Sequence, residues 1–153
     1  MKLIITVGLP GSGKSTYLAR LGVNAISSDE TRRLIADDLH DQNMNARIFA
    51  AVRYLVRQRM TVGRPITYVD ATHLTPWERK PYVRLARRYN CELEALFFDV
   101  PIEICMARNQ ARDRVVPEAA IQEMARRLVP PTKKEGFTRV TTIKSGNQQS
   151  EAL

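Results

Sequence analysis

The chain of 153 residues contains only two cysteines and two histidines. Cys91 and Cys105 lack metal-ligand spacing, and two cysteines cannot build the framework of a small disulfide-rich domain. We expect both to be buried, reduced thiols. His40 and His73 are also too few for a metal centre that depends on imidazole ligands. These scarcities exclude disulfide-stabilised and zinc-binding classes of protein.

Long apolar runs are missing as well. No segment approaches the roughly 20 apolar residues that span a bilayer, and the N-terminus lacks the basic region and the small-residue cleavage site of a signal peptide. We therefore expect a cytoplasmic protein without a membrane partner. A chain of this length predicts one domain with a sheet and covering helices, and leaves no room for a second catalytic domain.

Acidic residues are outnumbered, 16 against 24 basic ones, which gives a net charge of +8. Arginine supplies most of the excess, with 18 residues against six lysines. Because the planar guanidinium pairs bidentately with phosphate, this composition favours a polyphosphate ligand or nucleic acid. A basic surface that serves only solubility has the same composition, so charge alone does not separate the two.

The chain does contain a glycine-rich loop, Gly8–Thr16, directly after the apolar run Leu3–Val7. Its spacing, Gly-x4-Gly-Lys-Ser, is that of a Walker A motif, and the helix expected after it supplies the required context. In this motif Lys14 reaches the β- and γ-phosphates and Ser15 binds Mg²⁺. The loop therefore predicts ATP and Mg²⁺ as cofactors, held by Gly11, Ser12, Gly13, Lys14, Ser15 and Thr16.

Apolar runs alternate with segments of helical spacing along the chain. Strands are expected at 3–7, 66–69, 93–98 and 138–143, with a short one at 25–28, and helices lie between them. This order predicts an α/β fold, a P-loop NTPase-type three-layer domain with a parallel sheet and a helical lid. We expect the P-loop domain to span residues 1–143 and a flexible polar tail to span 144–153.

Three aspartates, Asp29, Asp70 and Asp99, each follow a strand, at the sheet edge where ligands bind. Each could instead be a helix cap or a structural carboxylate, and we leave Asp99 in that role. For phosphoryl transfer to a hydroxyl, Asp29 is the best candidate for a general base, with Arg32 and Arg33 one turn on to meet a phosphate on the acceptor. Asp70 lies where P-loop enzymes place an acid near Mg²⁺.

Arginines gather again between 108 and 114. Arg108 and Arg112 are four residues apart, so on a helix they project from one face, and Arg114 lies outside that stripe. Because Pro117 follows before another helix, we expect a lid whose arginines close over ATP and stabilise transition-state charge. A solvated helix with Asp113 as counterion is the competing interpretation.

The chain resembles the kinase domain of phage-type polynucleotide 5′-hydroxyl kinases and their bacterial RNA-repair relatives, within the zeta-toxin-like P-loop kinases. The similarity covers residues 3 to 130. It rests on these segments: the glycine-rich loop 8–16, Ser28–Arg32, Asp70–His73, Phe98–Pro101, and Arg108–Arg112 with the following Val116–Pro117.

The resemblance implies that Lys14 and Ser15 hold ATP and Mg²⁺ and that Asp29 is the general base for the 5′-hydroxyl. It also implies that Arg32 grips the acceptor's phosphate and that Arg108 and Arg112 contact ATP. Asp70 and Thr72 would line the acceptor site. The family often has Asn where this chain has His73. Relatives commonly carry a fused phosphatase or ligase, so we expect such an enzyme only as a separate partner.

We therefore expect an ATP-dependent kinase that phosphorylates the 5′-OH ends of RNA or DNA. One competing hypothesis is a P-loop kinase of a small hydroxylated metabolite, which could also carry a phosphate for Arg32. Another is an ATP-binding module without transfer activity. The sequence does not distinguish RNA from DNA, single strands from duplex ends, or monomer from oligomer.

Overall fold

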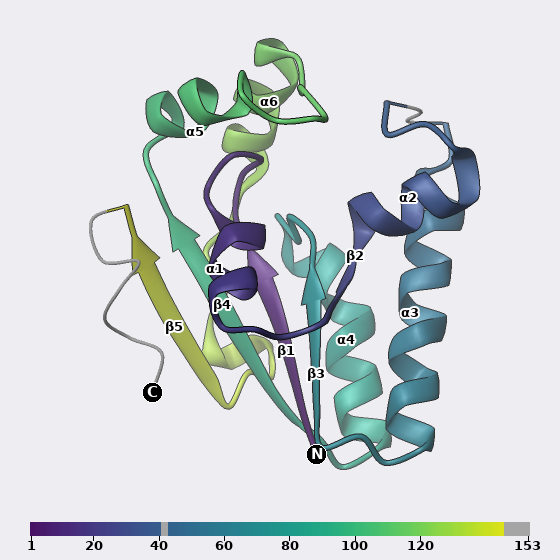
Figure 1. Ribbon diagram of the computed structural model, residues 1–153. Helices are drawn as coiled ribbons and strands as arrows, with labels where there is room; N and C mark the ends of the chain where they lie inside the picture. Colours follow the sequence, from purple (N-terminus) through teal and green to yellow (C-terminus); the bar gives the residue numbers. More distant parts are fainter. Residues whose placement is uncertain (41–42, 146–153) are drawn as a thin grey trace.

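The computed structural model describes residues 1–40 and 43–145 (Figure 1). Five strands form one sheet in the order β2-β3-β1-β4-β5, and every neighbouring pair is parallel. The strands are β1 (Lys2–Val7), β2 (Ala25–Ser27), β3 (Ile66–Asp70), β4 (Glu92–Asp99) and β5 (Arg139–Lys144). The helices are α1 (Lys14–Arg20), α2 (Ser28–Ala36), α3 (Asn45–Thr61), α4 (Pro76–Arg88), α5 (Ile102–Asn109), α6 (Glu118–Arg127) and the 3₁₀ turn η1 (Lys133–Glu135).

The central strand β1 divides the core into two clusters because successive side chains point to opposite faces. Leu3, Ile5 and Val7 pack with α3 and α4 on one face. Ile4 packs on the other face with α1 and with Cys105 of α5. Helices thus cover both faces of the sheet, and the predicted three-layer α/β fold is confirmed (Figure 1).

Local signals begin the helices at the cleft edge of the sheet. Thr75 forms a capping box with Glu78 at the start of α4, and Pro76 occupies the first turn, as the sequence predicts. Ser27 caps α2 by accepting a hydrogen bond from the Glu30 amide at 3.2 Å. The cap of α2 is therefore Ser27, which leaves the Asp29 side chain available for other contacts.

A buried ion pair fixes α4 to the turn before β5. The side chain of Arg79 is fully buried and donates to both carboxylate oxygens of Glu135, at 2.8 and 3.1 Å. It also donates to the carbonyl oxygen of His73 at 2.8 Å. A buried charge needs such partners. Through Arg79 the network connects the loop after β3, at His73, to the 3₁₀ turn η1 before β5.

Several expectations need adjustment at the ends of elements. Helix α5 ends at Asn109, so the expected single helical face for Arg108 and Arg112 is wrong: Arg112 lies in the turn that follows. Cys105 is buried, whereas Cys91 is only half-buried, and both thiols are free. Strand β5 ends at Lys144, which forms an ion pair with Asp99, and the rest of the expected tail, 146–153, lies outside the described residues.

No helix within the described ranges has the length and apolar character needed to cross a membrane.

Candidate active site

The glycine-rich loop connects β1 to α1 and lies against the first turns of α5. Gly11 and Gly13 have φ angles of 79° and 97°, which side chains disfavour. A Cβ atom at Gly11 would also collide with the carbonyl oxygen of Cys105. The glycine at position 11 is therefore required both for the backbone turn and for the close approach of α5.

Lys14 points into the centre of the loop. Its ammonium donates to the carbonyl oxygens of Gly8 and Leu9, at 3.1 and 2.7 Å. Burial, together with nearby Arg112 and against the opposing effect of Asp70, lowers the pKa of Lys14 to about 8. A bound phosphate would favour the charged form of Lys14 and offset the cost of its burial.

Ser15 and Asp70 meet where β3 ends and α1 begins. The Ser15 hydroxyl donates to Asp70 Oδ2 at 2.6 Å, across 55 residues of sequence. A hydroxyl and a carboxylate side by side fit Mg²⁺, which takes oxygen ligands and keeps waters and substrate phosphates in its remaining positions. No group of three or more His, Cys, Asp or Glu side chains gathers within the described ranges, and such a Mg²⁺ site does not need one.

Hydrogen bonds join the loop after β3 to β1 and to the glycine-rich loop. Thr6 Oγ1 donates to the Ala71 carbonyl at 2.7 Å and accepts from the Ala71 amide at 3.1 Å. The Gly8 amide donates to the Thr72 carbonyl at 3.0 Å. These bonds hold Asp70 and Thr72 at the floor of one cleft with Lys14.

His73 is buried within the same loop and has a positive φ of 44°. Burial lowers its pKa to about 4, so the ring is neutral and Nδ1–H donates to the Thr6 carbonyl at 2.6 Å. The ring packs edge-on against Tyr82, with 4.9 Å between centroids. His73 thus supports the floor of the cleft, and its Nε2 has no hydrogen-bond partner among the described residues.

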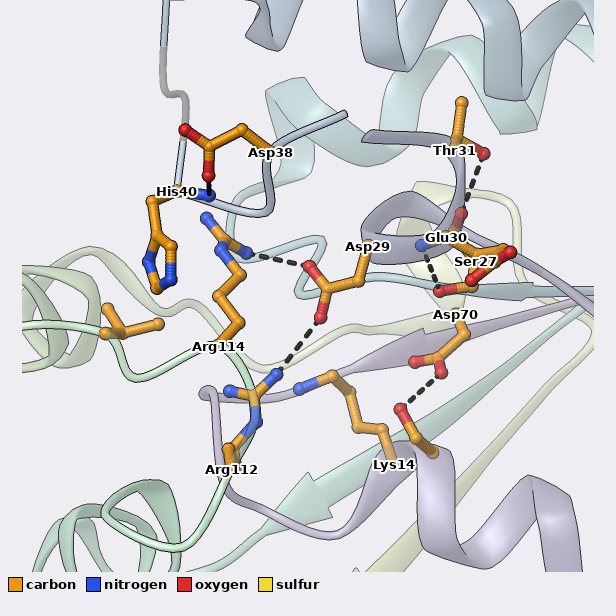
Figure 2. Close-up of polar contacts among 12 residues, drawn as sticks. Lys14, Ser27, Asp29, Glu30, Thr31, Asp38, His40, Asp70, Arg112 and Arg114 are labelled. Carbon is orange, nitrogen blue, oxygen red and sulfur yellow. Dashed lines mark hydrogen bonds and ion pairs between the residues drawn. The ribbon is translucent and has the colours of Figure 1, made fainter. Parts of the chain in front are cut away.

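Asp29 lies between two arginines of the segment that joins α5 to α6 (Figure 2). Arg112 Nη2 donates to Oδ2 at 3.1 Å, and Arg114 Nη1 donates to Oδ1 at 2.8 Å. The partner of both arginines is Asp29, not Asp113. The acidic candidate and the candidate lid therefore meet directly, although 83 and 85 residues separate them in sequence.

Arg114 is the site residue that the sequence reasoning missed. A helix that continued through Arg112 would place Arg114 on another face. In the structure the helix has ended, so Arg112 and Arg114 lie on an irregular segment and both reach the same carboxylate. The Arg-x-Arg alternation before Pro117 is the one local signal that could have indicated this.

All of these groups line one cleft of about 720 Å³ at the carboxyl edge of the sheet. One end holds the glycine-rich loop, Lys14, Ser15 and Arg108. The helices α2 and α3, which lie across from α5 in Figure 1, supply Phe49 and the buried Arg32, and the exposed Trp77 of α4 also lines the cleft. The arrangement can hold a triphosphate at one end and a second, anionic substrate at the other, with Asp29 between them.

Comparison with known proteins gives one family match and several similar chains. A family model described as an AAA domain matches residues 3–131. L-seryl-tRNA(Sec) kinase of Homo sapiens is 32% identical over 100 residues, which covers 63% of this chain and 28% of that protein. The same kinase of Mus musculus is 33% identical over 75 residues, 48% of this chain and 21% of that protein. The matches thus span less than a third of the length of these relatives.

Solved structures share the fold. A chain in the structure of the Pnkp1/Rnl/Hen1 RNA repair complex superposes with a TM-score of 0.69 at 27% identity, covering 83% of this chain and 43% of that one. A gluconokinase from Sinorhizobium meliloti 1021 superposes with a TM-score of 0.57 at 17% identity, covering 94% and 82%. At that identity the second likeness shows the fold alone.

Proposed function

The chain belongs to the AAA domain family, in which it is a P-loop kinase, and on this basis we propose that it transfers the γ-phosphate of ATP to the 5′-hydroxyl end of RNA or DNA. One observation carries the proposal. Asp29 lies in the same cleft as Lys14, and Arg32 follows it by one turn of α2 at the opposite end. An acceptor hydroxyl beside Asp29 would thus have a cation near its own phosphate.

Each side chain has a role in this reaction. Lys14 and the loop amides would bind the β- and γ-phosphates, and Ser15 with Asp70 would hold Mg²⁺, which neutralises charge on those phosphates. Asp29 would accept the proton as the hydroxyl oxygen forms its bond to the γ-phosphorus and the bond to ADP breaks. Arg108, Arg112 and Arg114 would move onto the transferring group, where developing charge makes their hydrogen bonds strongest.

The relatives support a nucleic-acid acceptor. By their names, one is a kinase of seryl-tRNA and another stands in an RNA repair complex. The side of the cleft formed by α2 and α3, which we call the acceptor end, offers Phe49 for base stacking and Arg32 and Arg53 for phosphates. The exposed Trp77 of α4 is a second aromatic ring that lines the cleft. The 5′-phosphate produced is the end that a ligase joins, so a separate ligase is the partner we propose.

The experiment measures transfer from γ-labelled ATP to 5′-OH oligoribonucleotides, oligodeoxynucleotides, a nucleoside and a sugar acid. We expect the oligonucleotides to be labelled best. Asp29→Asn should lower kcat by about 100-fold or more with ATP affinity nearly unchanged, because a general base is lost. Asp99→Asn is the matched control, since Asp99 is the last residue of β4 but pairs with Lys144 and does not line the cleft.

Two outcomes would contradict the proposal. Labelling of the sugar acid alone would make the protein a kinase of a small metabolite. An equal loss of ATP affinity in Asp29→Asn would place Asp29 on the metal and leave the reaction without its base.

A further inference from the structure

A second hollow lies beside the cleft, between α3 and α4, and has a volume of about 390 Å³. Both helices begin near the carboxyl edge of the sheet and run side by side away from it (Figure 1). We call this hollow the α3–α4 groove. Its lining residues are Ala50, Arg53, Tyr54, Arg57, Pro81, Arg84, Leu85 and Arg88.

Four arginines line the groove in two pairs. Arg53 and Arg57 are one turn apart on α3, and Arg84 and Arg88 are one turn apart on α4. Within the described part of the chain, none of the four forms an ion pair with a carboxylate. Like charges at this spacing destabilise a helix. The groove therefore concentrates positive charge that the fold itself does not neutralise.

The composition of the two helices explains the absence of counterions. Helix α3 has no acidic residue, and the single acidic residue of α4, Glu78, is used in the capping box and in an ion pair with Arg127. Other arginines of these helices do have partners: Arg59 donates to Thr67 and Ile66, and Arg79 to Glu135. Arg47 and Arg87 of the same helices also form no ion pair among the described residues, so what distinguishes the groove is that four such arginines line one hollow.

The groove continues from the acceptor end of the cleft, because Arg53 and Pro81 line both. It also carries an aromatic side chain: Tyr54 is 53% exposed, and the Arg57 guanidinium lies 5.8 Å from its ring centre. Basic grooves with exposed aromatic rings bind single-stranded nucleic acid, since phosphates pair with the cations and bases stack on the rings.

We propose that the α3–α4 groove binds the body of a single-stranded polynucleotide whose 5′ end is in the cleft. This inference rests on the proposed function and adds the direction in which the strand leaves the active site. The groove then determines the affinity for long acceptors, while the residues of the cleft carry out the phosphoryl transfer.

The test uses the double variant Arg57→Gln/Arg88→Gln, which changes the groove and no residue of the cleft. Its matched control, Arg47→Gln/Arg87→Gln, removes the same charge from exposed positions of the same helices that line neither site. We expect the groove variant to raise KM for a long 5′-OH oligonucleotide about tenfold, with kcat and the KM for a dinucleotide unchanged. The slope of log K against log salt should flatten by about 1.4, because each phosphate contact on a single strand contributes about 0.7.

A binding experiment separates this inference from the proposed function. It measures the affinity for a 5′-phosphorylated oligonucleotide by fluorescence anisotropy, and it does not require phosphoryl transfer. Weaker binding by the groove variant alone supports the groove as a nucleic-acid site even if no acceptor is labelled.

Equal losses of affinity in both double variants, or no loss in either, would overturn the inference. Binding of polyglutamate by the wild type as tight as that of the oligonucleotide would assign the groove to an acidic protein and also overturn it. Melting temperatures of both variants should not fall below that of the wild type, which shows that they fold.

Discussion

At the scale of single residues, the cleft holds more positive than negative charge. Lys14, Arg32, Arg108, Arg112 and Arg114 line it, against Asp29, Asp70 and the half-buried Glu78 at its rim. Burial lowers the pKa of Lys14 to about 8, so its charge is maintained at a cost. Anionic substrates would offset that cost, and the site is therefore built to gain affinity from phosphates.

His73 gives a prediction on pH. Its pKa of about 4 in the folded protein is below the ordinary 6.5, because burial disfavours the charged ring. The unfolded chain then binds the extra proton, so the stability from neutral His73 is complete above pH 6.5 and is lost as pH falls towards 4. We expect the free energy of unfolding to fall by up to about 1.4 kcal/mol per pH unit across this window, measured by urea titration at pH 7, 6 and 5.

His73→Asn should remove this dependence, since Asn does not titrate and tolerates a positive φ. The control is His40→Asn, because His40 is exposed and should leave the wild-type dependence in place. If His73→Asn keeps the full loss between pH 6.5 and 5, another group is responsible for it.

At the scale of elements, the segment between α5 and α6 positions the two arginines that reach Asp29. Asn109, fully buried at the end of α5, closes this segment: its side chain donates to the Val116 carbonyl at 2.6 Å and accepts from the Val116 amide at 3.0 Å. Both backbone groups of Val116 are thus paired by one side chain. The geometry of Arg112 and Arg114 depends on this closure.

Asn109→Ala should therefore loosen the segment while both arginines remain. We expect a loss of about 1–3 kcal/mol in the free energy of unfolding, since two buried backbone groups lose their partner. We also expect a lower kcat with little change in ATP affinity, because the arginines act on the transition state. Gln110→Ala, at the exposed next position, is the control for both measurements. A variant with reduced stability but wild-type kcat would show that the closure does not position the arginines.

At the scale of the whole molecule, the cleft lies at the carboxyl edge of the sheet, with residues drawn from all three layers. Four segments each supply one part of the cleft: the glycine-rich loop, the start of α2, the loop after β3 and the α5–α6 segment. A ligand that bridges these parts binds the folded state alone, so it should stabilise the entire domain.

Mg²⁺ with ATP should raise the melting temperature. At 100 times Kd, the expected stabilisation is about 2.7 kcal/mol. Lys14→Met should abolish the shift because the ammonium group that pairs with the β- and γ-phosphates is lost. Lys133→Met, at an exposed position, should retain the shift. Chelation by EDTA should reduce the shift in the wild type. A full shift in Lys14→Met would contradict the role of the glycine-rich loop in binding ATP.

Much of this protein could be predicted from local sequence. The order of strands and helices follows from apolar spacing, and the glycine-rich loop follows from residues adjacent in the chain. Thr75 and Pro76 also mark the start of α4 correctly. These features depend on backbone geometry and on neighbours within a few residues, which a linear pattern records.

Only the tertiary structure decides which distant side chains meet. The Ser15–Asp70 contact, the pairing of Asp29 with Arg112 and Arg114, and the α3–α4 groove all join segments far apart in sequence. The end of α5 at Asn109, on which the position of Arg112 depends, carries no glycine or proline signal. Sequence by itself determined the fold and the phosphate-binding loop, since their causes are local. Packing of the layers decided how the arginines are arranged, because a contact between distant residues exists only once the sheet has brought them together.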